Sequence, residues 1–301
     1  MEANKSIRVS DETQNGILQL SRRWDEMSPE LLSIIFRKIG PVDEMVRSVS
    51  LVCRGWLETV AGPDCWEEIE LQQWCRSHWN STSSRSDGAR LKVDSVVRRL
   101  VRWSKCTFKK LSASRLGDAG FSYVSNCGRC LKILHIPVSE ITDQMVIRHA
   151  RSLVSLTELD ISYCFMITFK GLEAFGKQCK SLTHLKRNMP PLESCEADDK
   201  EALTIANTMA RLQHLEFEFG RLTDVGVSAI FSECEALSYL SIHGCWNVML
   251  EGDLEERSKK LLLFIRPYVF DRNDSEGLSE NEGTEADSGS EEEEYVCVDS
   301  E

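Results

Sequence analysis

The apolar positions of this chain recur first at helical spacing and then in a repeating strand-and-helix pattern. Residues 24–66 contain three short apolar runs at helical spacing. Ser28 followed by Pro29 predicts the start of the first helix, and Gly40-Pro41 predicts its end. The apolar residues of this segment outnumber those that three short helices cover among themselves. Some of them are therefore expected to face a partner.

Beyond this segment the pattern Leu-x-x-Leu-x-apolar recurs. Regular copies begin at Leu131, Leu156, Leu212 and Leu237. The copy at Leu182 is degraded, since Arg187 replaces its last apolar residue, and looser copies begin at Trp66 and Phe108. A period of about 20–29 residues with this core predicts leucine-rich repeats, each a strand followed by a helix. Chance recurrence of leucine is the alternative.

These patterns predict an α/β fold. Helical residues 23–66 precede about six or seven leucine-rich repeats in residues 67–265. Parallel strands are expected on the concave side and helices on the outside, with a closing helix formed by Leu254 and residues 261–265. Residues 76–90 are polar and predict a surface loop, and residues 189–201 carry an insertion that is either a recognition loop or a tolerated bulge.

Cysteine, threonine and aspartate also repeat. Cys164 and Cys245 fall eight residues after Leu156 and Leu237, at the place where the repeat takes Asn or Cys to bond the turn. Thr and Asp recur where each helical half begins, and both residue types favour helix starts. These cysteines are therefore expected to be structural.

Composition changes the picture chiefly at the two ends. The formal net charge is −12, but residues 271–301 hold thirteen Asp or Glu against Arg272 alone. Residues 1–270 are thus neutral, which removes any argument for a nucleic-acid surface from bulk charge. Residues 1–22 and the acidic tail, residues 266–301, are expected to be disordered. No apolar run is long enough for a membrane span, so we expect a nuclear and/or cytoplasmic protein.

The sequence gives little sign of catalytic or metal chemistry. Its twelve cysteines are spread along the chain and are expected to be reduced thiols. Cys127 and Cys130 form a single C-x-x-C, a weak metal signal, and the ordered cysteine and histidine pairs of a zinc-bearing RING are lacking. No phosphate loop, dinucleotide fingerprint or nucleophile turn is present. We expect a non-enzymatic protein without a cofactor or resident metal.

The N-terminal segment resembles the F-box, the module through which substrate receptors of SCF-type ubiquitin ligases attach to a Skp-family adaptor. The resemblance rests on Pro29-Glu-Leu-Leu followed by Ile35-Phe36, and on Val52-Cys-Arg-x-Trp56 beyond it. The family usually has Leu-Pro at the start, where this chain has Met27-Ser28. A small helical cap on the next domain is the alternative interpretation. The resemblance implies that the following positions face the adaptor or form the module's core: Pro29, Leu31, Leu32, Ile35, Phe36, Val52, Cys53 and Trp56.

The repeats add to the resemblance. Together with the F-box they are most similar to plant F-box proteins described as Skp-interacting partners. This resemblance implies a substrate receptor that joins a target protein to the adaptor, and through it to cullin and RING subunits. Two alternatives remain, a small-molecule-dependent degron receptor and an adaptor-independent scaffold.

The repeat pattern also predicts a recognition surface. Alternate side chains of a strand point to opposite faces, so positions 3, 5 and 7 of each repeat line the concave side. A metal site from His184, His214 and Glu216 is conceivable there, but polar surface histidines for protein binding are the favoured interpretation. The predicted target-binding residues are His135, Glu158, Asp160, His184, Lys186, His214, Glu216, Tyr239 and His243.

Overall fold

The protein was analysed as a computed structural model that describes residues 24, 27–40, 42–80, 87–191 and 196–267. The expected disordered N-terminus and the tail from residue 268 onward lie outside these residues. The N-terminal module consists of short helices, as predicted, with the bounds α2 (Pro29–Phe36), α3 (Val42–Arg47), η1 (Val49–Leu51), α4 (Arg54–Val60) and η2 (Pro63–Cys65). Ser28 caps α2, since its hydroxyl accepts a hydrogen bond from the amide of Leu31.

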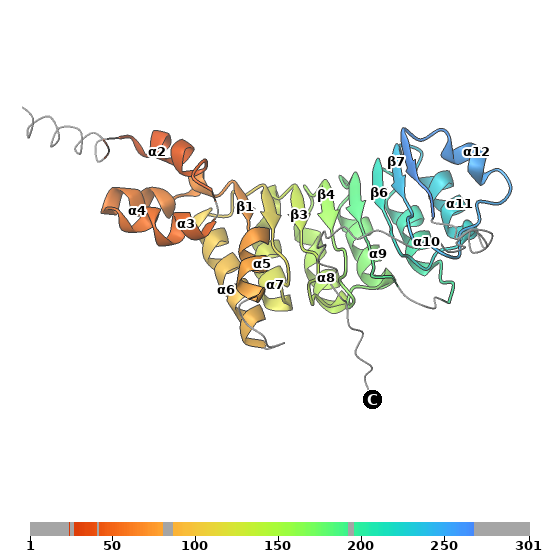
Figure 1. Cartoon of the computed structure of the whole chain (residues 1–301), viewed down its shortest axis with the longest axis horizontal. Coiled ribbons are helices and arrows are strands. Elements are labelled where there is room, and N and C mark those ends of the chain that lie inside the picture. The colour runs from red at the N-terminus through yellow and green to blue at the C-terminus, as the bar shows by residue number, and fades with distance from the viewer. Residues whose placement is uncertain (1–23, 25–26, 41, 81–86, 192–195, 268–301) are drawn as a thin grey trace, which may run out of the picture. The chain divides into compact units, whose positions relative to one another are not determined.

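The repeats form one parallel sheet. In the described part of the chain it has eight strands, which pair in chain order from β1 to β8. Figure 1 shows them side by side, with α6 to α11 on one side of the sheet. The strands are β1 (Glu68–Glu70), β2 (Lys110–Ser112), β3 (Ile133–His135), β4 (Glu158–Asp160), β5 (His184–Lys186), β6 (His214–Glu216), β7 (Tyr239–Ser241) and β8 (Leu263–Ile265).

Helices or turns connect successive strands. They are α5 (Gln72–Asn80), α6 (Asp87–Trp103), α7 (Asp118–Cys127), η3 (Gly128–Cys130), α8 (Asp143–His149), η4 (Ala150–Ser152), α9 (Phe169–Gln178), α10 (Lys200–Thr208), α11 (Asp224–Glu233) and α12 (Leu254–Ser258). The predicted loop 76–90 was therefore wrong at both ends. Helix α5 continues to Asn80 and α6 already begins at Asp87, because polar residues on the outer face of a helix interrupt its apolar pattern without ending it.

The closing helix was only partly predicted. Leu254 does begin a short helix, but the expected helix over residues 261–265 is wrong, because this segment forms β8. The amide of Leu262 donates to the carbonyl of Ser238, and the amide of Ile242 donates to the carbonyl of Ile265. An unpaired edge on β7 would leave such backbone groups without partners. The last segment thus extends the sheet beyond the six or seven expected repeats.

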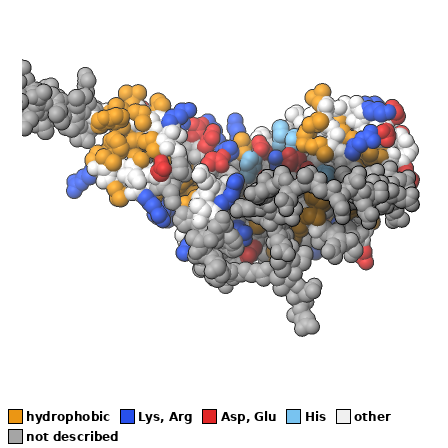
Figure 2. All heavy atoms as spheres, viewed as in Figure 1, with side chains coloured by type: hydrophobic (Ala, Val, Ile, Leu, Met, Phe, Trp, Pro, Cys, Tyr) orange, Lys and Arg blue, Asp and Glu red, His pale blue; other side chains and the backbone are white. Residues whose placement is uncertain are grey.

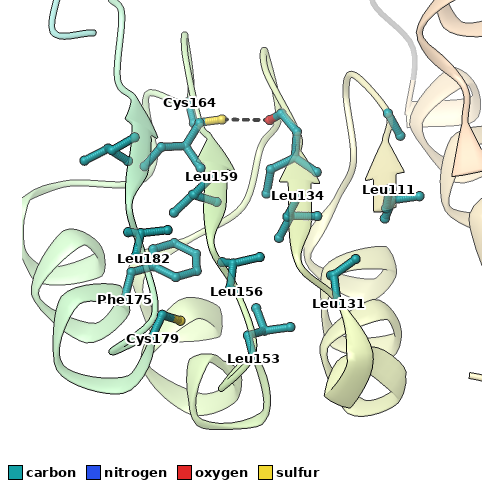
Figure 3. Close-up of a cluster of buried hydrophobic side chains, with 14 of the residues drawn as sticks. Leu111, Leu131, Leu134, Leu153, Leu156, Leu159, Cys164, Phe175, Cys179 and Leu182 are labelled. Carbon is teal, nitrogen blue, oxygen red and sulfur yellow. Dashed lines mark hydrogen bonds between the residues drawn. The ribbon is translucent and has the colours of Figure 1, made fainter. Parts of the chain in front are cut away.

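The repeated leucines form the core, as the pattern requires. Leu131, Leu134, Leu156 and Leu159 are completely buried and stack from one repeat to the next (Figure 3). Their parallel register is exact, since Leu134 lies opposite Leu159. Each repeat covers the open side of its neighbour, and the core is therefore continuous along the sheet.

Buried cysteines bond the turns between repeats. The thiol of Cys164 donates to the carbonyl of Ile136 at 3.2 Å, a bond drawn in Figure 3, and Cys245 donates in the same way to Phe217 at 3.0 Å. Burial raises the pKa of Cys164 to about 12. The predicted structural role of these cysteines is confirmed.

Aspartates link the helices of successive repeats. The carboxylate of Asp143, at the start of α8, accepts hydrogen bonds from the backbone and hydroxyl of Thr168 and from the amide of Gly171 in the next repeat. Asp199 makes the same three bonds two repeats later, to Thr223 and Gly226. The threonine thus caps the local helix, and the aspartate bonds the start of the helix in the next repeat.

Candidate docking and recognition surfaces

The N-terminal module has a small core of its own. Leu32 and Phe36 point inward from α2 and are 3% and 0% exposed. The ring of Phe36 packs against the ring of Trp56 at a centroid distance of 5.0 Å. These two residues were predicted either to face the adaptor or to form the module's core, and their burial places them in the core. They hold the module together and leave the outer positions to other residues.

Other predicted adaptor residues lie on the surface. Leu31 is 55% exposed and Val52 is 59% exposed, while Pro29 is also exposed. The structure adds Leu51, which is 78% exposed and was not predicted. A count of helical periodicity could not find it, because Leu51 ends a 3-10 turn and lies outside the α-helices. Figure 2 shows hydrophobic side chains gathered over this module.

A hollow lies beside these apolar residues. Its volume is about 410 Å³, and its lining includes Pro29, Cys53 and Trp56. The indole N–H of Trp56 is buried and has no hydrogen-bond acceptor among the described residues. A buried donor without a partner costs free energy unless another group or water satisfies it. The three predicted residues therefore meet at one recess.

Trp66 connects the module to the first repeats. Its side chain is almost completely buried, and its indole N–H donates to the carbonyl of Val60 at 2.6 Å. Its ring packs near the ring of Trp103 in α6, with a centroid distance of 5.8 Å. Glu67 adds ion pairs to Arg37 and Lys109. The link between the F-box helices and the sheet thus consists of packed side chains as well as the chain itself.

The strand face brings most predicted recognition residues together. His184, His214 and Tyr239 occupy the same position on β5, β6 and β7. The rings of His184 and His214 stack at 5.4 Å, and those of His214 and Tyr239 stack at 3.9 Å with an interplanar angle of 7°. The expected proximity of the two histidines is confirmed, and Tyr239 extends their stack.

Carboxylates surround this stack. Glu216 accepts hydrogen bonds or ion pairs from Lys186 at 2.8 Å and from His214 at 2.9 Å. Burial opposes its ionisation, but the bonds from Lys186 and His214 outweigh burial and lower the pKa of Glu216. Burial and the charges of Glu216 and Glu218 raise the pKa of Tyr239. In Figure 2, histidine and carboxylate side chains lie next to one another over the strands.

The remaining predicted residues lie further along the same face or at its edge. His135 on β3 contacts Glu158 on β4, with 2.7 Å between Nε2 and Oε1. Asp160 accepts from the amide of Ser162. His243 follows β7 and meets the ring of Phe219 edge-on at 5.5 Å. The nine residues thus form a continuous set from β3 to the end of β7, with the aromatic stack near one end.

Arg187 explains the degraded repeat. It stands at a core position, and although it is charged, its side chain is only 2% exposed. Its guanidinium donates to the carbonyls of Cys164 and Ile167 at 3.0 and 2.6 Å, and to both carboxylate oxygens of Glu201. Arginine therefore ties the turn of the preceding repeat to helix α10, which follows the insertion.

Metal binding and membrane insertion find no support in the described residues. No group of three or more His, Cys, Asp or Glu side chains among them could hold a metal ion. His184 and His214, considered above for such a site, are stacked ring to ring instead. None of the described helices has the length and apolarity needed to cross a bilayer.

Comparison with known proteins assigns the N-terminal module. The F-box domain profile matches residues 24–68. The chain is 38% identical to F-box protein FBW2 of Arabidopsis thaliana over 252 residues, which cover 83% of this chain and 76% of that protein. It is 32% identical to F-box protein SKIP1 of the same plant, over 74% and 79% of the two chains.

The fold also has counterparts. Putative F-box/LRR-repeat protein 9 of Arabidopsis thaliana is 29% identical and is covered over 92% of its length. Rad7, solved in its complex with Elc1 from yeast, superposes with a TM-score of 0.50 at 14% identity, and the match covers 85% of this chain and 64% of Rad7. An F-box followed by leucine-rich repeats defines the class of protein. Within that class, the chain belongs to the plant F-box/leucine-rich-repeat proteins.

Proposed function

We propose that this chain is the substrate-recognition subunit of an SCF-type ubiquitin ligase. F-box proteins are generally substrate adaptors and not catalysts, and the family assignment supports such a role. In the proposal the N-terminal module binds a Skp-family adaptor, which connects the chain to cullin and RING subunits. The repeats bind a target protein, and the complex acts in the nucleus and/or the cytoplasm.

The exposed apolar surface of the F-box carries the proposal. Leu31, Leu51 and Val52 are each more than half exposed, and an apolar recess with an unsatisfied indole N–H lies in the same module. Leaving these three apolar side chains in water is unfavourable, whereas burying them against a partner gains about 25 cal/mol per Å² of apolar surface. A docking surface accounts for these exposed residues, and a cap on the repeats does not.

The strand face supports the second half of the proposal. Tyr and His side chains with fixed carboxylates and one ammonium group give a surface that is rigid, aromatic and hydrogen-bonding at once. Aromatic residues such as Tyr are enriched at protein-binding sites. The chain then acts by proximity. It raises the effective concentration of target lysines near the charged conjugating enzyme and makes no covalent bond itself.

Reconstitution tests this function. The full chain is co-expressed with a plant Skp-family adaptor and a cullin–RING pair, and the mixture is separated by size exclusion. We expect one complex that contains all four proteins. Elution of the folded chain apart from the adaptor would refute the proposed function.

A further inference from the structure

One edge of the sheet carries a row of basic residues that the proposed function leaves unused. Five segments lead from the end of a helix into the next strand, from β2 to β6, and we call them the pre-strand segments: 104–109, 128–132, 150–157, 179–183 and 209–213. They contain seven basic residues and no Asp or Glu. The basic residues are Lys105, Lys109, Arg129, Lys132, Arg151, Lys180 and Arg211.

These segments lie at one edge because the strands are parallel. Every strand begins at the same edge of a parallel sheet, so the segments that precede the strands line up there. Figure 3 shows this for three of them: Leu131, Leu153 and Cys179 lie toward one edge, and Cys164, which follows a strand, lies toward the other. The basic row therefore extends across five neighbouring strands. At about 4.8 Å per strand it spans about 19 Å.

The row is accessible and largely uncompensated. All seven side chains are exposed. Lys109 forms an ion pair with Glu67, and Lys180 donates to the carbonyl of Gly176, but no ion pair between the other five and a described carboxylate is present. Burial and the charges of Arg148 and Arg151 lower the pKa of His149, which lies beside the row. Positive charge therefore dominates this edge from β2 to β6.

Helix dipoles explain only part of this pattern. A basic residue in or next to the last turn of a helix is stabilised by the helix dipole, and Arg129 and Arg151 are close enough to α7 and α8 to gain from it. Lys109 and Lys132 stand directly before β2 and β3, six and five residues beyond the ends of α6 and α7. The dipole acts only over the last turn, so it gives no reason for lysine at these two positions.

The row also lacks what single-stranded nucleic acid requires. Proteins that bind it stack its bases on exposed aromatic side chains. Phe108 is the one aromatic residue of the five segments, and it is completely buried. An acidic polypeptide needs no such platform, because its carboxylates pair with the ammonium and guanidinium groups directly. About six residues of extended chain span the row.

We propose that this basic edge binds an acidic segment of a partner protein. The bound segment runs along the pre-strand edge, crossing the strands, and its carboxylates meet the basic residues of successive repeats. The site is separate from the strand face that carries the histidine–tyrosine stack, so both surfaces can be occupied at the same time.

Fluorescence anisotropy tests this proposal. It measures the binding of the full chain to a fluorescent peptide of about twelve alternating Glu and Ser residues. The variant Arg129→Glu/Lys132→Glu reverses two charges in the row. Its matched control, Lys38→Glu/Arg54→Glu, makes the same change in total charge in the N-terminal module, away from the row. All these side chains are exposed, and thermal unfolding shows whether both variants fold.

We expect the first variant to lose at least about tenfold in affinity, equivalent to about 1.4 kcal/mol, and the control to lose less than about threefold. Affinity of the wild type should fall with salt. Equal losses in the two variants, or no binding at low salt, would overturn the proposal. Tighter binding of a mixed-sequence single-stranded RNA that is lost in the first variant would assign the edge to nucleic acid and overturn it as well.

Discussion

The guanidinium of Arg187 binds the carboxylate of Glu201 through two parallel hydrogen bonds, with 3.0 Å between Nε and Oε2 and 2.8 Å between Nη2 and Oε1. This pair lies where the other repeats place an apolar side chain. It stands on both sides of the insertion, since Arg187 follows β5 and Glu201 is in α10. The insertion is thus held at both ends, whichever role its loop has.

The pair gives an asymmetric prediction. Glu201→Ala leaves the buried guanidinium without its counter-ion and should lower the free energy of unfolding by about 3–5 kcal/mol. Arg187→Leu restores the apolar pattern and leaves the partly exposed Glu201 to water, but it also removes the bonds to the carbonyls of Cys164 and Ile167, so it should cost about 1–3 kcal/mol, less than Glu201→Ala. Urea unfolding of both variants measures the difference. Equal costs for the two variants would contradict the asymmetry that the buried guanidinium predicts.

The aspartate link between repeats predicts a local loss of stability. Asp143→Ala removes three hydrogen bonds to the next repeat and should cost about 2–3 kcal/mol. Gly171→Ala should also destabilise the protein, because a Cβ at this position would lie 2.6 Å from the carboxylate of Asp143. The exposed pair of Glu173 and Lys177 supplies the control: Glu173→Ala should cost less than about 0.5 kcal/mol. If Asp143→Ala matched this control, the link would have no energetic role.

The buried cysteines predict a loss of stability at alkaline pH. Burial raises the pKa of Cys164 and Cys179 to about 12, whereas thiols in the unfolded chain titrate near 8.5. As the pH rises between these values, the unfolded chain releases protons that the folded chain keeps, so the free energy of unfolding falls. Denaturation at pH 8, 9, 10 and 11 measures this slope. Cys164→Ala should make it shallower, and an unchanged slope would contradict the assignment.

Sequence periodicity predicted the repeats well because their core is a simple spacing rule. The buried leucines, the turn-bonding cysteines and the alignment of His184 with His214 all follow from the position within the repeat. Strand β8 was missed because Leu261 to Ile265 is an unbroken apolar run, which has no period of two. The segment forms a strand because its backbone pairs with the open edge of β7, and this edge exists only once the sheet has formed.

The site was less predictable than the fold, for two physical reasons. The sequence could not separate the core residues Leu32 and Phe36 from the surface residue Leu31, because apolar side chains on a short helix look alike until its packing is known. It also could not show that Tyr239 stacks on His214, because stacking depends on the register between strands. The basic edge also could not be seen from the net charge, because the acidic and basic residues of positions 1–270 are equal in number.

Target recognition is predicted to depend on the aromatic stack. Tyr239→Ala removes the ring that covers His214 but leaves the buried core unchanged, so the protein should fold and lose targets. Phe165→Ala is the control, since Phe165 is an exposed aromatic residue outside the strands. Affinity purification from plant extract, followed by mass spectrometry, compares the proteins retained by each variant. An identical set of retained proteins for Tyr239→Ala and wild type would exclude the stack from recognition.

Adaptor affinity tests the central claim most directly. The double variant Leu31→Asp/Val52→Asp places two charges on the exposed apolar surface of the F-box, and Ile147→Asp/Val154→Asp places two charges on equally exposed apolar positions in the repeats. All four side chains are more than half exposed, so both variants should keep the circular dichroism and unfolding midpoint of the wild type. Calorimetric titration with a purified Skp-family adaptor then gives the dissociation constants. We predict at least a hundredfold weaker binding for the F-box variant, about 2.7 kcal/mol, and a change within about twofold for the control. Wild-type affinity in the folded F-box variant would contradict the account.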